Sequence, residues 1–357
     1  MSALRIGIVG AGFMGAVHAR AARAAGARVT GIVASTPERG STAAEELGID
    51  RGFATLDEML ASGEMDVIHI TTPNRLHAPQ ALAVLDAGLP VVCEKPLTTS
   101  LASARALADA AAGQVATVPF VYRFHPLVRD ARARIAAGEI GPVITVRGAY
   151  LQDWLLSAPA DAWRLNPVDG GRSVTFADVG SHLVDLLEFV TGDRIVRLVA
   201  TARTVGPGRV PRAVSAGEQS IALTVEFSRG AIGSLLVSQV APGRKNQLSF
   251  EIAGSDASVA FDQEHPETMW VGKRAASMLI LRDAAQMAPD AARLERTPAG
   301  HPQGYQDAFT AFAADTYAAV AGAAPDGLPT FEDGVRAVQL TEAVLESAAT
   351  GQWEDTP

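Results

Sequence analysis

Lys95 is the first residue whose type and position could support chemistry. It follows Glu94 and the apolar run 91–93, and Pro96 comes directly after it. The run predicts a buried strand, which would place Lys95 at the carboxyl end of a parallel strand, where open α/β sheets bind ligands. Pro96 restricts the Lys95 backbone and removes one donor. A surface lysine is the usual alternative, so the choice depends on the rest of the chain.

An acid and a histidine form a second candidate group. Asp178 and His182 stand four residues apart in a segment whose apolar residues recur at helical spacing. Both side chains are therefore expected on one helix face. An acid in that position can set the tautomer of a histidine and tune its pKa, which suits proton transfer. The structural alternative is an aspartate favoured by the helix dipole beside a half-buried histidine.

A glycine-rich turn predicts a nucleotide site. Gly10, Gly12 and Gly15 form G-x-G-x-x-G between a predicted strand and a predicted helix, the context of a dinucleotide fingerprint. The first glycine permits a tight turn, the second lets the backbone approach a pyrophosphate, and the third lets helix and strand pack closely. The amides at the helix start, where Phe13 and Met14 stand, would face the phosphates. A glycine turn without a ligand is the alternative.

The end of the second predicted strand bears on cofactor choice. NAD-specific folds usually place an acid there, about 20 residues beyond the glycines, for the ribose 2′-hydroxyl. This chain has Ser35, Thr36 and Arg39 and no acid at the strand end, so a 2′-phosphate could be tolerated. The same residues could simply cap the next helix, with Pro37 at its first position. Both interpretations can hold together, and NADP stays open beside NAD.

Other predicted cofactor contacts follow the ends of later strands. As a lone histidine, His77 is expected to be structural or a cofactor-side contact rather than a catalyst. The predicted contacts in this part of the chain are Thr71, Thr72, Pro73, Asn74, His77, Glu94 and Lys95.

A mixture of aromatic and polar residues suggests a carbohydrate site. The run 150–156 contains Gln152 and Asp153, whose side chains can bond hydroxyls, beside rings that can stack on sugar faces. A sheet edge with amphipathic aromatics is the alternative. We expect His301 to join this wall from the excursion 283–303, acting as a partial lid; the rival is a surface or subunit contact. The predicted substrate-side residues are Lys95, Tyr122, Gln152, Asp153, Trp163, Arg164, Asp178, His182 and His301.

The order of predicted elements separates two domains. Strands and helices alternate through residue 119, which predicts a parallel sheet covered on both faces. After a helix, strands follow one another without helices between most of them, which predicts an antiparallel sheet. We therefore expect an α/β Rossmann domain at 1–121 and an α+β domain with a large, open, mainly antiparallel sheet at 122–357. The later predicted strands cover 141–153, 194–204, 217–227, 231–240, 246–253 and 257–262, and closing helices cover 304–321 and 331–349.

Composition limits the classes of protein that fit. The 357 residues suggest two domains, and 48% hydrophobic residues can fill their cores. Thirty basic and 39 acidic residues leave a net charge of −9, which argues against nucleic acid or an anionic membrane as a partner. The single cysteine excludes an internal disulfide and a cysteine-based zinc cluster. No run of about 18 apolar residues that could span a membrane is evident, and no signal core precedes the first strand, so a cytoplasmic protein is expected.

Together these motifs resemble the Gfo/Idh/MocA family of sugar and polyol oxidoreductases. The resemblance covers essentially the whole chain. The run 150–156, Trp163 and Arg164, and 301–305 are similar to the branch that includes levoglucosan dehydrogenase and related glycoside-oxidising enzymes. The motifs that carry the family resemblance are the fingerprint at 10–15, Glu94-Lys95-Pro96, the run 122–126 and Asp178-x-Gly180-x-His182.

The resemblance implies a hydride transfer between a secondary alcohol of a cyclic sugar, glycoside or inositol and a nicotinamide. It implies that Lys95, Asp178 and His182 lie near the nicotinamide, with Arg123, Trp163 and Arg164 among the cofactor contacts. It also suggests NAD, a cis Lys95–Pro96 peptide, and a homodimer or homotetramer assembled through the C-terminal sheet.

The chemistry leaves the first proton acceptor open. Lysine is a poor base at its ordinary pKa of about 10.4. Burial and a cationic nicotinamide would lower the pKa of Lys95, and His182 is the other proton carrier. Two other functions remain in competition: a non-catalytic protein that senses dinucleotide or sugar on the same fold, and a glycoside-processing enzyme that retains its NAD.

Overall fold

The computed structural model describes residues 3–157, 163–205, 211–212 and 217–356. The chain forms two compact units. The first combines Met1–Val121 with Tyr305–Val338, and the second combines Tyr122–Gly304 with Gln339–Pro357. The sequence placed 305–338 in the second domain, whereas the structure groups this segment with the first unit.

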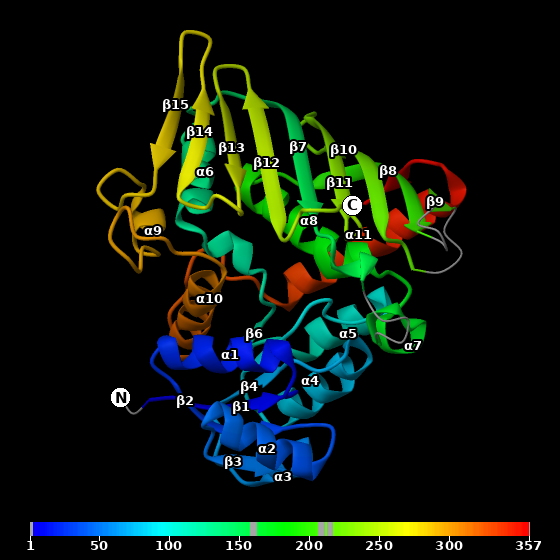
Figure 1. Ribbon diagram of the computed structural model, residues 1–357, viewed down its shortest axis with the longest axis vertical. Coiled ribbons are helices and arrows are strands. Elements are labelled where there is room, and N and C mark those ends of the chain that lie inside the picture. Colours follow the sequence, from blue (N-terminus) through cyan, green and yellow to red (C-terminus); the bar gives the residue numbers. More distant parts are fainter. Residues whose placement is uncertain (1–2, 158–162, 206–210, 213–216, 357) are drawn as a thin grey trace. The chain divides into compact units, whose positions relative to one another are not determined.

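The first unit is built on a six-stranded parallel sheet in the order β3-β2-β1-β4-β5-β6 (Figure 1). Two crossovers in opposite directions from β1 give this order, and the carboxyl ends of β1 and β4 meet where it reverses. All four residues of β4 are buried, as expected for a central strand covered on both faces. The strands are β1 (Arg5–Val9), β2 (Arg28–Val33), β3 (Arg51–Phe53), β4 (Val67–Ile70), β5 (Val91–Cys93) and β6 (Ala116–Thr117).

Hydroxyl side chains begin three of the helices in this unit. Thr36, Thr55 and Ser100 each accept a hydrogen bond from the backbone amide three residues later, which satisfies a free donor of the first turn. The helices are α1 (Phe13–Ala24), α2 (Pro37–Leu47), α3 (Leu56–Ala61), η1 (Asn74–Leu76), α4 (His77–Asp86), α5 (Leu101–Ala110) and α10 (Tyr305–Val320).

Two contacts explain why the late segment joins this unit. Helix α10 packs along α1. Thr330 forms an antiparallel bridge with Thr117, and Val118 donates its amide to the carbonyl of Pro329 at 3.2 Å. These pairings are long-range, so nothing in the local sequence at 305–338 specifies them.

The second unit is built on a large mixed sheet in the order β15-β14-β13-β12-β7-β11-β10-β8-β16, with β9 pairing β8 off this path (Figure 1). Its pairings are antiparallel except β7 with β11. The sequence did not predict β14, β15 or β16. The strands are β7 (Val143–Leu151), β8 (Ile195–Val205), β9 (Pro211–Arg212), β10 (Ser220–Phe227), β11 (Ile232–Ser238), β12 (Gln247–Gly254), β13 (Ser258–Asp262), β14 (Thr268–Gly272), β15 (Ser277–Leu281) and β16 (Glu354–Asp355).

Helices cover one face of this sheet. Gly148 in β7 allows the close approach of α8 (Ser181–Thr191), because a Cβ there would lie 3.1 Å from methyl groups of both Leu183 and Leu187. Buried and exposed residues alternate along β10 and β11, so the opposite face is open. The other helices are η2 (Val121–Phe124), α6 (Pro126–Ala136), η3 (Trp154–Leu156), η4 (Trp163–Leu165), α7 (Pro167–Gly170), the π-helical turn η5 (Phe176–Gly180), α9 (Pro289–Ala292) and α11 (Phe331–Thr350), which runs from the first unit into the second.

Candidate active site

The glycine turn after β1 can only be built from glycine. Gly10 has φ +113°, and a Cβ there would lie 2.7 Å from the backbone of Thr71. A Cβ on Gly15 would lie 2.1 Å from the carbonyl oxygen of Gly10. Thr71 fixes the turn by donating its hydroxyl to the carbonyls of Gly10 at 2.9 Å and Val9 at 3.1 Å. The turn and the start of α1 are therefore locked together.

The start of α1 has the properties of a pyrophosphate site. A Cβ on Gly12 would meet no atom within 4 Å, so the backbone is open to a ligand there. Within the described helix, Gly12 caps without a side-chain hydrogen bond, and the first turn holds no acid that would compete for the amides. The positive end of the helix dipole favours a phosphate at this point. Phe13 is 73% exposed beside it. The residues present fit a dinucleotide cofactor.

The predicted ribose residues lie in the turn between β2 and α2. Ser35, Thr36 and Arg39 are all exposed. The Thr36 hydroxyl accepts from the Arg39 amide at 3.3 Å, so the helix-capping interpretation of this segment is confirmed. This cap uses neither the Ser35 side chain nor the Arg39 guanidinium. A contact of either group with the ribose remains a prediction.

His77 joins the two loops that follow β4 and β5. Its ring is buried, with Nδ1 2.8 Å from the carbonyl oxygen of Pro96 and Nε2 2.8 Å from that of Thr72. Burial lowers the pKa of His77, while the two carbonyl contacts and the charge of Glu94 oppose that shift. The ring thus ties the predicted cofactor loop to the Lys95–Pro96 peptide, which is a structural task.

Glu94 and Lys95 stand directly beyond β5. Glu94 is 5% exposed, and its Oε2 accepts the backbone amide of Lys95 at 3.2 Å. Lys95 is half-buried, and the Lys95–Pro96 peptide is cis, as the family resemblance implied. The position of Lys95 at the carboxyl end of a parallel strand agrees with the sequence prediction.

In the second unit, the acid–histidine pair lies where a π-helical turn enters α8. Asp178 belongs to η5 and His182 is the second residue of α8. Such single π turns are rare and recur at functional sites. Gly180 permits the turn, since a Cβ there would lie 2.4 Å from the ring of Phe176. The spacing of four residues predicted an ordinary helical face, and the structure places the aspartate on a wider turn.

Amide side chains link Asp178 to Gln152, which the sequence predicts to bind the sugar. Gln239 is fully buried, and its Nε2 donates to Asp178 Oδ2 at 2.7 Å and to Gln152 Oε1 at 3.0 Å. Gln152 Nε2 in turn donates to Asn246 Oδ1 at 2.8 Å. One continuous set of hydrogen bonds therefore joins the predicted proton-handling group to Gln152.

Two tyrosines continue this network to the histidine. The Tyr150 hydroxyl donates to Asn246 Oδ1 at 2.7 Å, and Asn246 Nδ2 donates to the Tyr122 oxygen at 3.1 Å. The remaining 2.5 Å contact between the phenols then requires Tyr122 to donate to Tyr150, which closes a ring of three bonds. Burial raises the pKa of Tyr122, so its hydroxyl keeps its proton. The Tyr122 ring packs edge-on against His182 with centroids 5.1 Å apart.

Sequence reasoning missed Gln239 and Asn246. Gln239 follows β11 and Asn246 precedes β12, and these two strands flank β7, which Gln152 follows. Leu151 pairs with both Ser238 and Gln247, so the three amide residues meet at one edge of the sheet. Polar residues at strand ends were visible in the sequence, but the strand order that makes them neighbours was not.

Two residues predicted to contact ligands also have partners within the protein. Arg123, expected at the cofactor, forms a buried bidentate pair with Asp185 of α8, with its Nε 2.8 Å from Asp185 Oδ2. Asp153, expected at the sugar, accepts from Lys245 Nζ at 2.7 Å and from the Gly243 amide at 3.0 Å. The Lys245 hydrogen bond holds the pKa of Asp153 below its usual value. The sequence did not predict these protein partners, and the ligand contacts of both residues stay predictions.

Trp163 is half-buried in the turn η4, and the side chain of Arg164 lies outside the described residues. Their predicted roles stay predictions.

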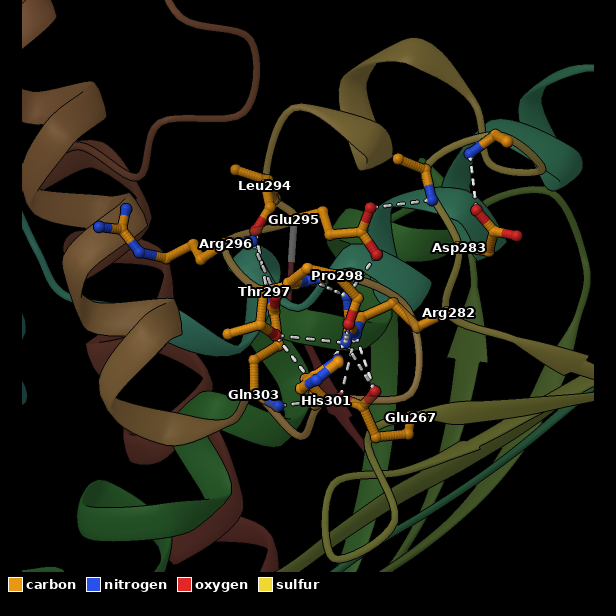
Figure 2. Close-up of polar contacts among 12 residues, drawn as sticks. Glu267, Arg282, Asp283, Leu294, Glu295, Arg296, Thr297, Pro298, His301 and Gln303 are labelled. Atoms are coloured by element: carbon orange, nitrogen blue, oxygen red, sulfur yellow. Dashed lines mark hydrogen bonds and ion pairs between the residues drawn. The ribbon is translucent and has the colours of Figure 1, made fainter.

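The excursion 283–303 is held in place by a dense set of hydrogen bonds and ion pairs. Figure 2 shows its turns gathered around Arg282, whose guanidinium is fully buried. Arg282 pairs with Glu267 and Glu295, and it donates to the carbonyls of Thr297 at 2.8 Å and His301 at 2.7 Å. Arg282 Nη2 and the Thr297 hydroxyl each donate to the His301 carbonyl at 2.7 Å, and the residue is exposed. Its role at the sugar remains a prediction.

Among the described residues, no group of three or more His, Cys, Asp or Glu side chains is arranged to hold a metal ion. Of the helices in this part of the chain, none combines the length and apolar character that crossing a membrane requires.

Comparison with known proteins agrees with this arrangement. Residues 4–121 match the family model described as "Oxidoreductase family, NAD-binding Rossmann fold", and residues 128–260 match the "GFO/IDH/MocA C-terminal domain". Levoglucosan dehydrogenase of Pseudarthrobacter phenanthrenivorans is 28% identical over 100% of this chain and 99% of its own length. The 1,5-anhydro-D-fructose reductase of Ensifer adhaerens is 30% identical over 93% and 92%.

A solved structure extends the similarity to the whole fold. Levoglucosan dehydrogenase in complex with NADH and levoglucosan superposes with a TM-score of 0.91 at 28% identity, covering 100% of both chains. The family models, the full-length relatives and the parallel sheet with its glycine turn lead to one assignment. The chain belongs to the Gfo/Idh/MocA family of NAD-binding oxidoreductases.

Proposed function

We propose that the protein is an NAD-dependent dehydrogenase that oxidises a secondary alcohol of a cyclic sugar, glycoside or inositol. The hydrogen-bonded network around Asp178 and His182 carries this proposal. Within it, Gln152 and Asn246 are partly buried amides that can bind hydroxyl groups as both donors and acceptors, and the fully buried Gln239 holds Gln152 in place. A hydroxyl-rich substrate needs such groups, because each buried hydroxyl must find a hydrogen-bond partner.

The proposed reaction separates hydride and proton transfer. Bound nicotinamide supplies the hydride chemistry. In the oxidation direction, the alcohol proton needs a base, and the proposal assigns that task to the Lys95 amine or the His182 imidazole. Asp178, which already accepts from Gln239 Nε2 at 2.7 Å, is proposed to orient and polarise His182.

The substrate class rests on relatives that span the whole chain. Levoglucosan dehydrogenase and 1,5-anhydro-D-fructose reductase both carry names that specify cyclic, anhydro-type sugars. A levoglucosan-like anhydrosugar is therefore the first substrate to test, followed by inositols. Position 35 holds a serine and no acid that would repel a 2′-phosphate. NADP is therefore tested beside NAD.

The test is a substrate panel with both cofactors. Purified protein is incubated with NAD or NADP and with levoglucosan, 1,5-anhydro sugars, common pyranoses and inositols, and reduced cofactor is followed by absorbance. Sugar-dependent reduction supports the proposal. Binding of cofactor and sugar without turnover favours a sensor. Cofactor that copurifies and is never exchanged favours a glycoside-processing enzyme with retained NAD.

We also propose that the protein acts in the cytoplasm as a homodimer or homotetramer. The open face of the second sheet supports the assembly, because Ile232, Leu236, Trp270 and Leu279 are exposed on its strands. Exposed apolar patches of this kind commonly mark protein interfaces.

A further inference from the structure

Four polar side chains form a continuous chain inside the first unit. They come from four elements: Tyr317 from α10, His69 from β4, His18 from α1 and Glu94 from the end of β5. The Tyr317 hydroxyl lies 3.2 Å from His69 Nε2, the two histidine Nδ1 atoms are 2.9 Å apart, and His18 Nε2 lies 2.9 Å from Glu94 Oε1. All four residues are at most 7% exposed.

The hydrogen-bond chemistry of these groups allows a single polarity when Glu94 is a carboxylate and both histidine rings carry one proton. A carboxylate only accepts, so His18 must donate from Nε2. A neutral His18 then presents a bare Nδ1, which obliges His69 to donate from its own Nδ1. His69 Nε2 is therefore the acceptor for the Tyr317 hydroxyl. Every donor in the chain points toward Glu94.

The buried surroundings favour a His69 ring with one proton, as this arrangement requires. Burial lowers the pKa of His69 far below its ordinary value, and a charge on His18 would lower it further. Burial also raises the pKa of Tyr317, so that its hydroxyl stays a donor. The ring of Phe309 packs edge-on against His18 with centroids 5.2 Å apart and contributes an apolar wall. Buried polar networks of this kind fix a unique geometry when every member is satisfied.

The other end of the chain reaches the predicted catalytic lysine. Glu94 Oε1 accepts from His18, while its Oε2 accepts the backbone amide of Lys95 at 3.2 Å. The Glu94 carboxylate thus links the chain of histidines, through one oxygen, to the backbone amide of Lys95, through the other. We propose that His18, supported by His69 and Tyr317, is a positioning residue that sets Lys95 for catalysis through Glu94. This inference rests on the proposed function.

The first test measures the tautomers and needs no catalysis. Nitrogen-15 NMR of the ring nitrogens in the full-length protein should show His18 protonated at Nε2 and bare at Nδ1, and His69 protonated at Nδ1 and bare at Nε2. The opposite tautomers, or a doubly protonated ring at neutral pH, would overturn the proposed polarity. This result is independent of whether the protein is a dehydrogenase.

The second test separates positioning from simple destabilisation. His18→Leu removes the donor to Glu94, and kcat is expected to fall about 10- to 100-fold because reacting groups are misplaced. KM for the sugar and the affinity for NAD should not change. His18→Gln, whose amide N–H can replace Nε2 as donor, should recover most of the lost kcat.

Val17→Ala is the matched control. Val17 precedes His18 on α1 and is 1% exposed, so the variant loosens the same helix without touching the polar chain. Its kcat should stay at the wild-type value. Unchanged kcat in His18→Leu, or equal losses in the Leu, Gln and Val17→Ala variants, would overturn the positioning role. Wild-type protein that turns over none of the sugars in the panel would instead count against the proposed function, and the NMR result would still stand.

Discussion

The side-chain amide of Gln239 connects a residue predicted to act in proton transfer, Asp178, with a residue predicted to bind the sugar, Gln152. Gln239 binds Asp178 and Gln152 through the same Nε2, while its Oε1 accepts from the Thr175 hydroxyl at 3.0 Å. A neutral amide in this position stabilises an ionised Asp178 by donating to it. The identity of residue 239 therefore controls the electrostatics of the candidate proton-handling pair.

Gln239→Glu should shift the pH dependence of the reaction. Two carboxylates at hydrogen-bond distance cannot both ionise easily, so the pKa of Asp178 rises. On acidification, Asp178 then takes up its proton at a higher pH than in the wild type, and activity that requires its ionised form is lost there. The acidic limb of the kcat/KM profile should therefore move up by about one pH unit or more. Gln239→Met removes the same donor without adding a charge, so its acidic limb should move less than that of Gln239→Glu. An acidic limb that stays in place in Gln239→Glu would remove Asp178 from the mechanism.

Lys95→Ala tests the lysine. Its side chain projects from the loop after β5, while the buried neighbours Glu94 and His77 hold the backbone there, so the fold should persist. Turnover should fall about 10²- to 10⁴-fold, the usual range for a general acid–base group. Affinity for NAD should be retained. Steady-state kinetics measures the turnover, and an NAD titration measures the cofactor affinity. Near-normal turnover would exclude Lys95 from proton transfer.

At the scale of elements, one buried carboxylate and one buried arginine each fix a segment of the second unit. Glu218 accepts from the Phe176 amide at 2.9 Å and from the Ser173 hydroxyl at 2.5 Å, which fixes the entrance to the π turn that carries Asp178. Burial raises the pKa of Glu218 against these hydrogen bonds. The excursion 283–303 depends in the same way on Arg282 (Figure 2).

Arg282→Met should destabilise the second unit. Removing a fully buried guanidinium leaves Glu267 and Glu295 without their shared cation, and breaking such a pair costs about 3–5 kcal/mol. Chemical denaturation measures the free energy of unfolding, and limited proteolysis should cut within 283–303. Arg293→Met is the matched control: its pair with Asp290 is over one-third exposed, so the expected cost is about 0–1 kcal/mol. Equal costs for both variants would contradict a central role for Arg282.

For the whole molecule, the open sheet face of the second unit is the feature left to explain. It is hollowed over β7, β12, β13 and β14, with a cavity of about 500 Å³ bordered by Ser249, Ala260, Trp270 and Leu279. Polar and apolar groups are mixed there, as they are in protein interfaces. A second copy of the chain is the proposed occupant.

Charges on this face should disrupt the proposed assembly. Leu236 and Leu279 are 43% and 62% exposed, and replacing both by glutamate places two charges in an apolar contact. Sedimentation velocity should show the double variant as a monomer, with its circular dichroism unchanged. Leu82→Glu is a control on α4, where the leucine is 36% exposed in the other unit. A double variant that sediments like the wild type would place the interface elsewhere.

The sequence by itself determined the elements that depend on local patterns. Glycine at 10 and 15 is required by close backbone approach, and the strand at 91–93 follows from a short apolar run, so the nucleotide turn and the place of Lys95 could both be predicted. The family followed from the same motifs. The roles of the individual site residues remain predictions, because spacing along a helix indicates a shared face but not a partner.

Only the tertiary structure decided which distant residues meet. Strand order placed Gln239 and Asn246 on either side of Gln152, drew 305–338 into the first unit, and directed Arg123 to Asp185 and Asp153 to Lys245. The polar chain from Tyr317 to Glu94 likewise spans more than 200 residues and four elements. Hydrogen bonds between side chains depend on packing geometry at the ångström scale, and local sequence patterns carry no information about such long-range contacts.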